Sequence, residues 1–353
     1  MKIIRLCTLL DFGGLEQRLA TISKVDDSNE WVFCALGTGG DAAKQIEKNG
    51  KRVVLLETSY TIPSLQAIFE LLRFFKNERP DMVHTSGAEA NFHGIIAAKI
   101  TGVKKLISEE IGIPNQKFFH RFAFRLLYKF PSHILGNAFP VGKYLSEVNG
   151  VPSDKLKIIP NPVDFSSIKD IERSESSEFH ILTVSRLKAV KNIEGVLRVI
   201  ACLKKDGKAV RFTVVGEGDH FPVLRNLVNE LDLKEQVDFK GYLPKPFSVI
   251  ECADIFVLNS FTEGFSNALA EAMAAGIPSL AADVGAARDL ITESETGWLV
   301  SAGDDDGLYG KLNFIMSLEK SRRENVGKTG RISIREKFSL ERHMDQLMEL
   351  YHN

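Results

Sequence analysis

The chain has 353 residues, of which 44% are hydrophobic and 26% charged, and its formal net charge at pH 7 is −1. This length fits about two domains, and the composition is that of a folded protein, which excludes disordered and collagen-like chains. No uncharged apolar run approaches the roughly 20 residues that a membrane-spanning helix needs, which excludes an integral membrane protein.

Short apolar runs alternate with longer amphipathic segments along the chain, which is typical of βαβ units around parallel sheets. In the first half we expect strands at 3–9, 31–35, 53–56, 82–84, 105–108 and 133–135. The helices expected between them are 16–24, 41–48, 64–77, 91–101, 118–128 and 141–148. In the second half the expected strands are 180–184, 210–215, 237–239, 255–258 and 278–281. The pattern predicts an α/β fold of two doubly wound domains.

A change in composition marks the domain boundary. The run from Ile158 to Asp164 holds two prolines around Asn161, and a polar stretch follows it at 166–178. Because proline restricts φ, we expect a rigid turn and then a linker. We therefore place the N-terminal domain at 1–165 and the C-terminal domain at 178–338. The amphipathic segment 339–353 is predicted to be a packing helix, with the N-terminal domain as a candidate partner.

The two halves differ in charge. Residues 1–163 hold 21 Lys and Arg against 16 Asp and Glu, and the remainder holds 24 against 30. This split indicates that only the first half meets an anionic partner, either a membrane surface or nucleic acid. The four scattered cysteines form no Cys-x-x-Cys pair, so we expect buried thiols in a cytosolic chain; they are Cys7, Cys34, Cys202 and Cys252. The apolar start lacks a cleavage site and is expected to be a strand, not a signal peptide.

Adjacent glycines, Gly13 and Gly14, follow the first expected strand and precede a helix. They let a ligand approach the backbone closely, and the helix N-terminus behind them offers free N–H groups to an anion. An ordinary tight turn explains the same pattern.

A basic loop with Arg186 and Lys191 follows the strand at 180–184. Ligands of open α/β sheets bind beyond the carboxyl ends of the strands, and two cations suit a diphosphate. A solvated basic loop is the alternative. Gly216 and Gly218 follow the next strand, but the third glycine of a dinucleotide fingerprint is missing. An NAD oxidoreductase is therefore a distant alternative, and a backbone contact to a nucleotide stays open.

The most informative segment is 263–278. A loop and the start of a helix rich in small residues are expected at Glu263, Gly264, Phe265, Ser266 and Asn267. Ser266 or Asn267 can cap this helix, whose N-terminus favours negative charge. Glu271 follows Glu263 by a little over two helical turns, so both carboxylates are placed to line one groove. A surface or capping role is the alternative for Glu271.

In this order the motifs resemble the retaining nucleotide-sugar glycosyltransferases of family 4. That family has the GT-B fold, in which two Rossmann-like parallel-sheet domains face each other across a cleft. The resemblance covers nearly the whole chain and rests on Gly13-Gly14-x-Glu16, Pro80-Asp81-x-Val83-His84, the run from Ile159 to Asp164, Ser185-Arg186-Leu187 with Lys191-Asn192, Val215-Gly216-x-Gly218, and Glu263 with Glu271 before Gly276-x-Pro278. It implies an acceptor-binding N-terminal domain and a donor-binding C-terminal domain.

The resemblance also implies roles for single residues. Arg186 and Lys191 would grip the donor diphosphate and stabilise the charge of the leaving group. Glu271 would bind the ribose and Glu263 would orient the transferred sugar. The other implied donor contacts are Gly13 and Gly14, which would close over the diphosphate, and Gly216, Gly218, Gly264, Phe265, Ser266 and Asn267.

Retention in this family is attributed to front-face attack, in which a donor phosphate oxygen helps to accept the proton. The resemblance therefore implies no acid–base pair at glycosidase spacing, no metal ion and no cofactor. Asp304-Asp305-Asp306 contains an Asp-x-Asp, but it precedes a helical pattern, so helix capping is expected there. Many relatives carry a His after the fifth strand, where this chain has Ser108-Glu109-Glu110. We take Glu110 as the catalytic candidate of the N-terminal domain, and Glu109 and His84 as acceptor contacts.

The segment 117–130 holds four Lys and Arg, six aromatic residues and no acid. It suits a helix lying on an anionic bilayer, and equally a core helix whose cations face water. With the resemblance, it favours a lipid-linked saccharide acceptor, a UDP-sugar donor, and assembly of O-antigen or capsule at the cytoplasmic face of the membrane. The alternatives are a transferase with a soluble acceptor, a sugar-nucleotide epimerase of the same fold, and an inactive nucleotide-sugar-binding subunit. No nucleic-acid module matches.

Overall fold

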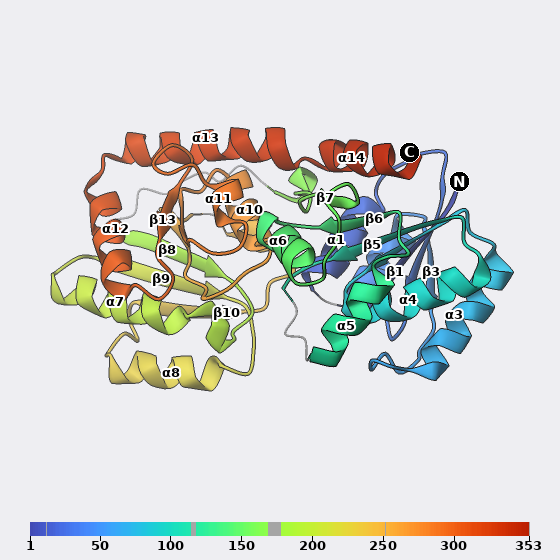
Figure 1. Ribbon diagram of the computed structural model, residues 1–353. Helices are drawn as coiled ribbons and strands as arrows, with labels where there is room; N and C mark the ends of the chain where they lie inside the picture. Colours follow the sequence, from blue (N-terminus) through green and yellow to red (C-terminus); the bar gives the residue numbers. More distant parts are fainter. Residues whose placement is uncertain (12, 114–117, 169–177, 251, 353) are drawn as a thin grey trace. The chain divides into compact units, whose positions relative to one another are not determined.

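The chain folds as two units, each built around one parallel sheet (Figure 1). The computed structural model describes residues 1–353 except 12, 114–117, 169–177, 251 and 353. Unit 1 consists of residues 1–162 and 340–353, and unit 2 of residues 163–339. The chain therefore passes between the two units twice.

Unit 1 contains a seven-stranded parallel sheet in the order β3-β2-β1-β4-β5-β6-β7. Its strands are β1 (Lys2–Cys7), β2 (Glu30–Ala35), β3 (Arg52–Leu55), β4 (Met82–Ser86), β5 (Lys105–Glu110), β6 (His133–Gly136) and β7 (Leu156–Ile158). The central strands β1, β4 and β5 are buried over almost their whole length, as expected of a parallel sheet covered on both faces.

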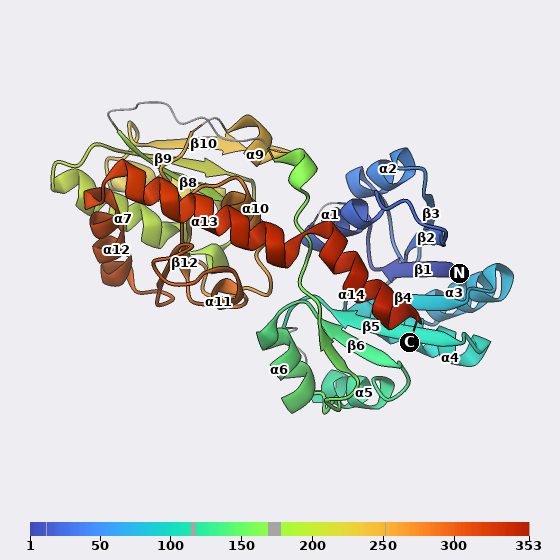
Figure 2. The same ribbon diagram turned by 90° about the horizontal axis from the view of Figure 1, so that it is seen from above.

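The helices of unit 1 cover both faces of this sheet. They are α1 (Gly14–Ile22), α2 (Asp41–Lys48), α3 (Leu65–Glu78), α4 (Ala88–Thr101), α5 (Phe118–Leu127), α6 (Phe139–Glu147) and α14 (Leu340–His352). Helix α14 lies beside α1, while α3, α4 and α5 contact one another in series (Figures 1 and 2). Leu347 and Tyr351 of α14 belong to the same hydrophobic core as Ile3, Leu19 and Phe33. The expected packing helix at 339–353 is thus an integral part of unit 1.

Unit 2 contains a six-stranded parallel sheet in the order β10-β9-β8-β11-β12-β13. Its strands are β8 (Phe179–Val184), β9 (Val210–Val215), β10 (Val237–Gly241), β11 (Ile255–Leu258), β12 (Ser279–Ala282) and β13 (Trp298–Val300). Its helices are the 3-10 turns η1 (Phe165–Ser167) and η2 (Ala189–Lys191), and α7 (Ile193–Lys205), α8 (Phe221–Glu230), α9 (Pro246–Val249), α10 (Asn267–Ala274), α11 (Ala287–Leu290), α12 (Asp305–Ser317) and α13 (Lys320–Phe338). Chain order reverses between β8 and β11, which makes these strands the switch point of the sheet.

Two details differ from the sequence-based expectations. Strand β7 was not among the expected strands. It ends at Ile158, where the segment that we assigned to the junction turn begins, and its three residues are too few for an apolar run to be visible. Cys202 is exposed on α7 and Cys252 is half-buried, so the expectation of buried thiols holds only for Cys7 and Cys34. The expectation is wrong for Cys202 because this residue lies on the outer face of the amphipathic helix α7.

Short hydrogen bonds fasten the segments at the two chain crossings. In unit 2, the Val163 amide donates to the Phe338 carbonyl at 2.8 Å, and Val163 forms a β-bridge with Ser339. In unit 1, His343 Nδ1 lies 2.7 Å from the Pro160 carbonyl oxygen and donates to it. No helix among the described residues is both long and apolar enough to span a membrane.

Candidate functional site

The carboxyl ends of β8 and β11 bring two predicted site residues of unit 2 together. Lys191 follows β8 and Glu263 follows β11, and the Lys191 ammonium donates to Glu263 Oε1 at 2.5 Å. The Ser260 hydroxyl donates to the same oxygen at 2.7 Å. The Lys191 and Glu263 side chains are 20% and 11% exposed, so both reach the surface. Because ligands of open α/β sheets bind at the switch point, this pair marks a candidate ligand site.

Arg186 lies in the same loop, two residues after the end of β8, and is exposed. The loop itself is fixed by its neighbour after β9. The Ser185 amide donates to Val215 O at 3.0 Å, and the Leu187 amide donates to Glu217 O at 2.8 Å.

Gly216 and Gly218 make this close packing of loops possible. A Cβ atom built on Gly216 would lie 1.8 Å from the Ser185 carbonyl oxygen, and one on Gly218 would lie 2.1 Å from that of Leu187. Gly216 also has a φ of +134°, which L side chains rarely adopt. The Gly-x-Gly pattern is therefore required by the backbone of unit 2, and its contact with a nucleotide stays a prediction.

Helix α10 begins where the sequence indicated. Ser266 is its N-cap, with the hydroxyl accepting from the Leu269 amide at 3.4 Å, and Asn267 is the first helical residue. Gly264 O accepts from the Ala286 amide at 2.9 Å, and the buried Phe265 ring packs on Phe338 at 5.6 Å between centroids. These contacts hold the loop before α10 in place. The capped N-terminus of α10 carries the positive end of the helix dipole.

Glu271 is half-buried on α10 and, among the described residues, has neither a hydrogen-bond nor an ion-pair partner. Burial raises the pKa of its carboxyl to about 7, and the negative charge of Asp164 adds to this shift. A ligand that donates hydrogen bonds to such a carboxylate stabilises its charged form. The hydroxyl groups of a sugar are donors of this kind.

We expect the Glu271→Gln substitution to change how stability depends on pH. The folded-state pKa of about 7 exceeds the ordinary 4.5, so the native state holds this proton more tightly than the unfolded state. The stabilisation is complete below the unfolded pKa and is lost as pH rises through 7. Unliganded Glu271→Gln should therefore be more stable than the wild type at pH 8, by about 1–2 kcal/mol after screening of a partly exposed group.

Thermal unfolding at pH 5.5 and pH 8 measures this difference. The wild-type melting temperature should fall more between the two values than that of the variant. Parallel curves for the two proteins would contradict the raised pKa of Glu271.

The first turn of α1 carries the glycine pair of unit 1. Gly13 is the N-cap and Gly14 the first helical residue. Gly13 has an extended φ of 167°, which any residue adopts, and an added Cβ would meet only the movable Glu16 carboxylate. The backbone of the turn does not itself require this glycine, and the contact of the glycine pair with a diphosphate stays a prediction. Phe12, which we included in the motif, lies outside the described residues.

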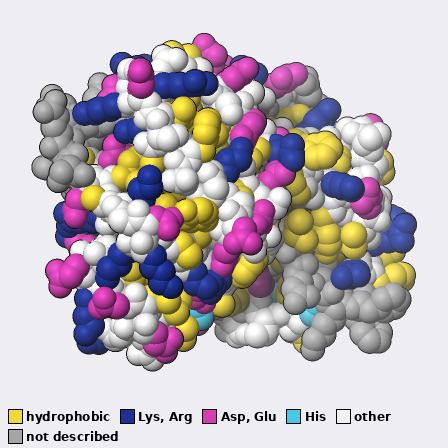
Figure 3. Space-filling view, turned by 90° about the vertical axis from the view of Figure 1, so that its left-hand side faces the viewer, with side chains coloured by type: hydrophobic (Ala, Val, Ile, Leu, Met, Phe, Trp, Pro, Cys, Tyr) yellow, Lys and Arg dark blue, Asp and Glu magenta, His cyan; other side chains and the backbone are white. Residues whose placement is uncertain are grey.

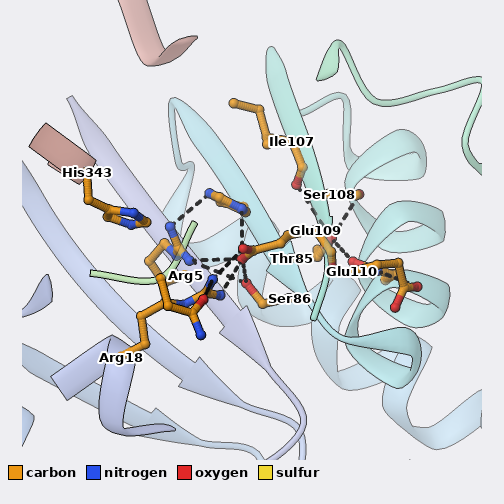
Figure 4. Close-up of polar contacts among 12 residues, drawn as sticks. Arg5, Arg18, Thr85, Ser86, Ile107, Ser108, Glu109, Glu110 and His343 are labelled. Carbon is orange, nitrogen blue, oxygen red and sulfur yellow. Dashed lines mark hydrogen bonds and ion pairs between the residues drawn. The ribbon is translucent and has the colours of Figure 1, made fainter. Parts of the chain in front are cut away.

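At the end of β5 the two candidate glutamates lie on opposite faces of the sheet, because side chains alternate along a strand (Figure 4). Glu109 accepts two hydrogen bonds from Arg18, both at 2.5 Å, and a third from Ser86 at 3.0 Å. Arg5 lies 3.6 Å away. Burial alone would raise the pKa of Glu109, but the charges of Arg18 and Arg5 outweigh it and the pKa is lowered.

Glu110 is buried on the other face, toward α4 and α5. It accepts hydrogen bonds from the Tyr128 hydroxyl and from Asn91 Nδ2, the latter at 3.2 Å. Burial raises its pKa to about 7, although both hydrogen bonds oppose this shift. Glu110 therefore titrates near neutral pH, as a general acid or base should.

His84 is fully buried beneath α14. Its Nδ1 lies 2.9 Å from Arg5 Nη1 and 2.6 Å from the Tyr351 hydroxyl. Because a guanidinium only donates, Nδ1 is an acceptor and the ring proton is on Nε2. Burial lowers the pKa of His84, and Arg5 and Arg18 lower it further, so the ring is neutral. Contacts inside unit 1 occupy both His84 and Glu109, and their acceptor role stays a prediction.

Several residues of this cluster were missed in the sequence. Arg5, Arg18, Tyr351 and His343 come from three different elements, and Asn161 accepts from Arg18 at 2.9 Å. One signal was present: an arginine stands inside the apolar first strand, and buried arginine needs partners. Asp304 caps α12 by accepting from the Gly307 amide at 2.8 Å, which confirms the capping expectation. No group of three or more His, Cys, Asp or Glu side chains converges as a metal site within the described ranges.

Two family models match adjoining parts of this chain. The model "Glycosyltransferase Family 4" matches residues 12–167, and "Glycosyl transferases group 1" matches residues 164–332. Together they cover the glycine pair, the Lys191–Glu263 pair and Glu271. The chain belongs to these glycosyltransferases.

The glycosyltransferase has the GT-B fold of solved relatives. HepE of Anabaena, solved in complex with UDP, superposes with a TM-score of 0.86 at 20% identity, over 100% of both chains. Among curated relatives, a Campylobacter jejuni alpha-1,4-N-acetyl-D-galactosaminyltransferase named for a diphospho-undecaprenol-linked acceptor is 28% identical over 92% of each chain. The N-acetyl-alpha-D-glucosaminyl L-malate synthase of Bacillus anthracis is 27% identical over 54% of this chain and 49% of its own length. The predicted fold and family are thus confirmed.

Proposed function

We propose that this glycosyltransferase transfers a sugar, with retention of configuration, from a UDP-sugar to a lipid-linked saccharide in bacterial polysaccharide synthesis. The observation that carries the donor site is the convergence of Lys191 and Glu263 at the β8–β11 switch point, beside helix α10, where the Glu271 carboxyl has no hydrogen-bond partner among the residues that the structure describes. The support for a lipid-linked acceptor is the relative named for one, which matches along 92% of this chain.

In the proposed site the residues have different tasks. Arg186 and Lys191 bind the diphosphate and neutralise the charge that grows on it as the bond to the sugar breaks. Glu263 holds the Lys191 ammonium in place and orients the transferred sugar. Glu271 accepts hydrogen bonds from the ribose hydroxyls, and the loop before α10 offers backbone N–H groups. With the leaving charge neutralised by these cations, we propose that transfer needs neither a metal ion nor another cofactor.

The acceptor hydroxyl would attack from the side that the diphosphate leaves, and a phosphate oxygen would help to take its proton. Glu110, buried and titrating near pH 7, is the proposed group of unit 1 for the acceptor side. The intact set of Arg186, Lys191, Glu263 and Glu271 argues against an inactive subunit. An epimerase would consume the donor without an acceptor and release no free sugar.

A transferase with a soluble acceptor is the second candidate, supported by the relative named N-acetyl-alpha-D-glucosaminyl L-malate synthase. The two candidates differ in their acceptor alone. Assays with a radiolabelled sugar distinguish them, because label moves into an organic-solvent extract only when the acceptor is a lipid.

A thermal-shift screen of UDP, GDP and ADP, with and without EDTA, tests the donor site. A ligand that binds only the native state raises the melting temperature. At a concentration of 100 times its Kd, it adds about 2.7 kcal/mol to the free energy of unfolding. We expect a shift with UDP that survives EDTA. We expect Glu271→Ala to need at least tenfold more UDP for the same shift in melting temperature. We expect Glu263→Ala to keep the wild-type shift and to lose sugar transfer.

The opposite pattern, in which Glu263→Ala loses UDP and Glu271→Ala keeps it, would overturn the assignments. A shift that EDTA abolishes would contradict a metal-independent site.

A further inference from the structure

Helix α5 and the turn after it carry three stripes of side chains at four-residue spacing. Phe124 and Tyr128 are buried and fasten the helix to unit 1, where Phe124 packs on Phe92 at 6.2 Å between centroids. Phe122, Leu126 and Phe130 are 62%, 44% and 50% exposed. Backbone bonds from Tyr128, Lys129 and Phe130 to residues three or four positions earlier continue the helical turn beyond Leu127, so the apolar stripe is continuous.

A cationic stripe runs beside the apolar one. Arg121, Arg125 and Lys129 are all exposed, and α4 and the residues after it add Lys99, Ile100 and Lys104, also exposed. Lys99 lies 5.3 Å from the centre of the Phe130 ring, which joins the two groups into one surface. We call these side chains, from α5, the turn after it and the end of α4, the α5 face.

The charges of the α5 face are uncompensated within the described part of the chain. None of its five cations forms an ion pair there, and none of the described residues from 118 to 130 is acidic. Elsewhere many surface cations have acidic partners, such as Arg52 with Glu78 and Arg288 with Asp283. The molecular face in Figure 3 likewise shows cationic and anionic side chains interspersed.

A helix that exposes large apolar side chains beside unpaired cations fits the boundary between water and an anionic bilayer. The apolar stripe enters the acyl region, and the cations meet the lipid phosphates. Nucleic acid would use the cations but would leave an aliphatic and aromatic stripe without a partner. We infer that the α5 face docks unit 1 onto an anionic membrane surface, with Phe122, Leu126 and Phe130 inserted. This inference deepens the proposed function, on which its purpose rests: the face brings the enzyme to a lipid-linked acceptor.

Co-sedimentation of the full chain with vesicles tests the inference. We expect binding to vesicles of phosphatidylcholine with 30% phosphatidylglycerol, and little binding to phosphatidylcholine alone. Each cation near the surface accounts for about a fivefold change in partition, so Arg121→Gln/Arg125→Gln should reduce binding about 25-fold. Phe122→Ser/Leu126→Ser should reduce it at least as much, because these variants remove the inserted side chains.

Matched controls lie in unit 2. Lys205→Gln/Lys208→Gln removes two exposed cations, and Phe314→Ser/Ile332→Ser removes two exposed apolar side chains; both should bind vesicles like the wild type. Equal losses in the control and test variants, or unchanged binding in the test variants, would overturn the inference. A soluble protein that protects the α5 face from limited proteolysis while vesicles do not would replace the bilayer by a protein partner.

The UDP thermal shift, recorded for every variant without vesicles, separates this inference from the proposed function. It reports both the fold and the donor site. A normal UDP shift with no vesicle binding defeats only the membrane inference. Vesicle binding without any nucleotide shift defeats only the proposed donor.

Discussion

Replacing Lys191 by alanine is expected to lower kcat/KM for sugar transfer by about 100- to 1,000-fold, the usual loss when one preorganised charge is removed from a transition state. The Lys191 ammonium is held 2.5 Å from Glu263 Oε1, and its position is therefore fixed before the substrate arrives. The charge on the leaving diphosphate grows as the bond breaks, so most of the loss should appear in kcat. Steady-state kinetics with varied donor measure the division between kcat and KM.

Lys188→Ala is the matched control, because Lys188 is an exposed cation three residues away in the same loop. It should keep activity within about threefold, since a screened surface charge contributes little. If Lys191→Ala raised only KM, the lysine would bind ground state and transition state equally. If the two variants lost the same activity, general electrostatic attraction of the donor by the basic loop would explain the result, and the role assigned to Lys191 would be wrong.

The second large effect concerns stability. Glu109→Ala is expected to lower the free energy of unfolding by about 3–5 kcal/mol, because it leaves two buried guanidinium groups without their shared carboxylate. Arg5 and Arg18 are 1% and 3% exposed, so water cannot replace the lost partner. Total stabilities of about 5–15 kcal/mol are typical, and the loss is a large part of that. Urea unfolding followed by circular dichroism measures it.

The same carboxylate makes the wild type sensitive to acid. The pKa of Glu109 is lowered in the folded state, so its stabilisation is present above the ordinary value of 4.5 and is lost as pH falls through the folded value. Glu109→Ala should therefore lose this part of the acid dependence. Asp232→Asn is the control: its side chain is 93% exposed, and asparagine tolerates the positive φ of 52° at this position. A comparable loss of stability in the control would refute the buried-pair explanation.

Sequence periodicity was enough to predict most strands, because buried parallel strands are continuous apolar runs. It also placed Lys191 and Glu263 after their strands. It could not predict their contact, since that depends on β8 and β11 being neighbours although 72 residues separate the partners. Glu109 and Glu110 were visible as a pair of candidates. Their separation into an ion-paired and a proton-binding carboxyl follows from strand alternation and from Arg18 and Tyr128, whose positions only the tertiary fold determines.

The composition of unit 1 has a consequence for the order of synthesis on the ribosome. Met344, Leu347, Leu350 and Tyr351 complete a core that begins with Ile3, yet they are translated after the whole of unit 2. Unit 2 can therefore close its core while unit 1 still lacks one covering helix. At that stage His84 and Arg5 do not yet have the Tyr351 hydroxyl as a hydrogen-bond partner. Most of unit 1 is made first, yet unit 1 cannot complete its core before unit 2 has been synthesised.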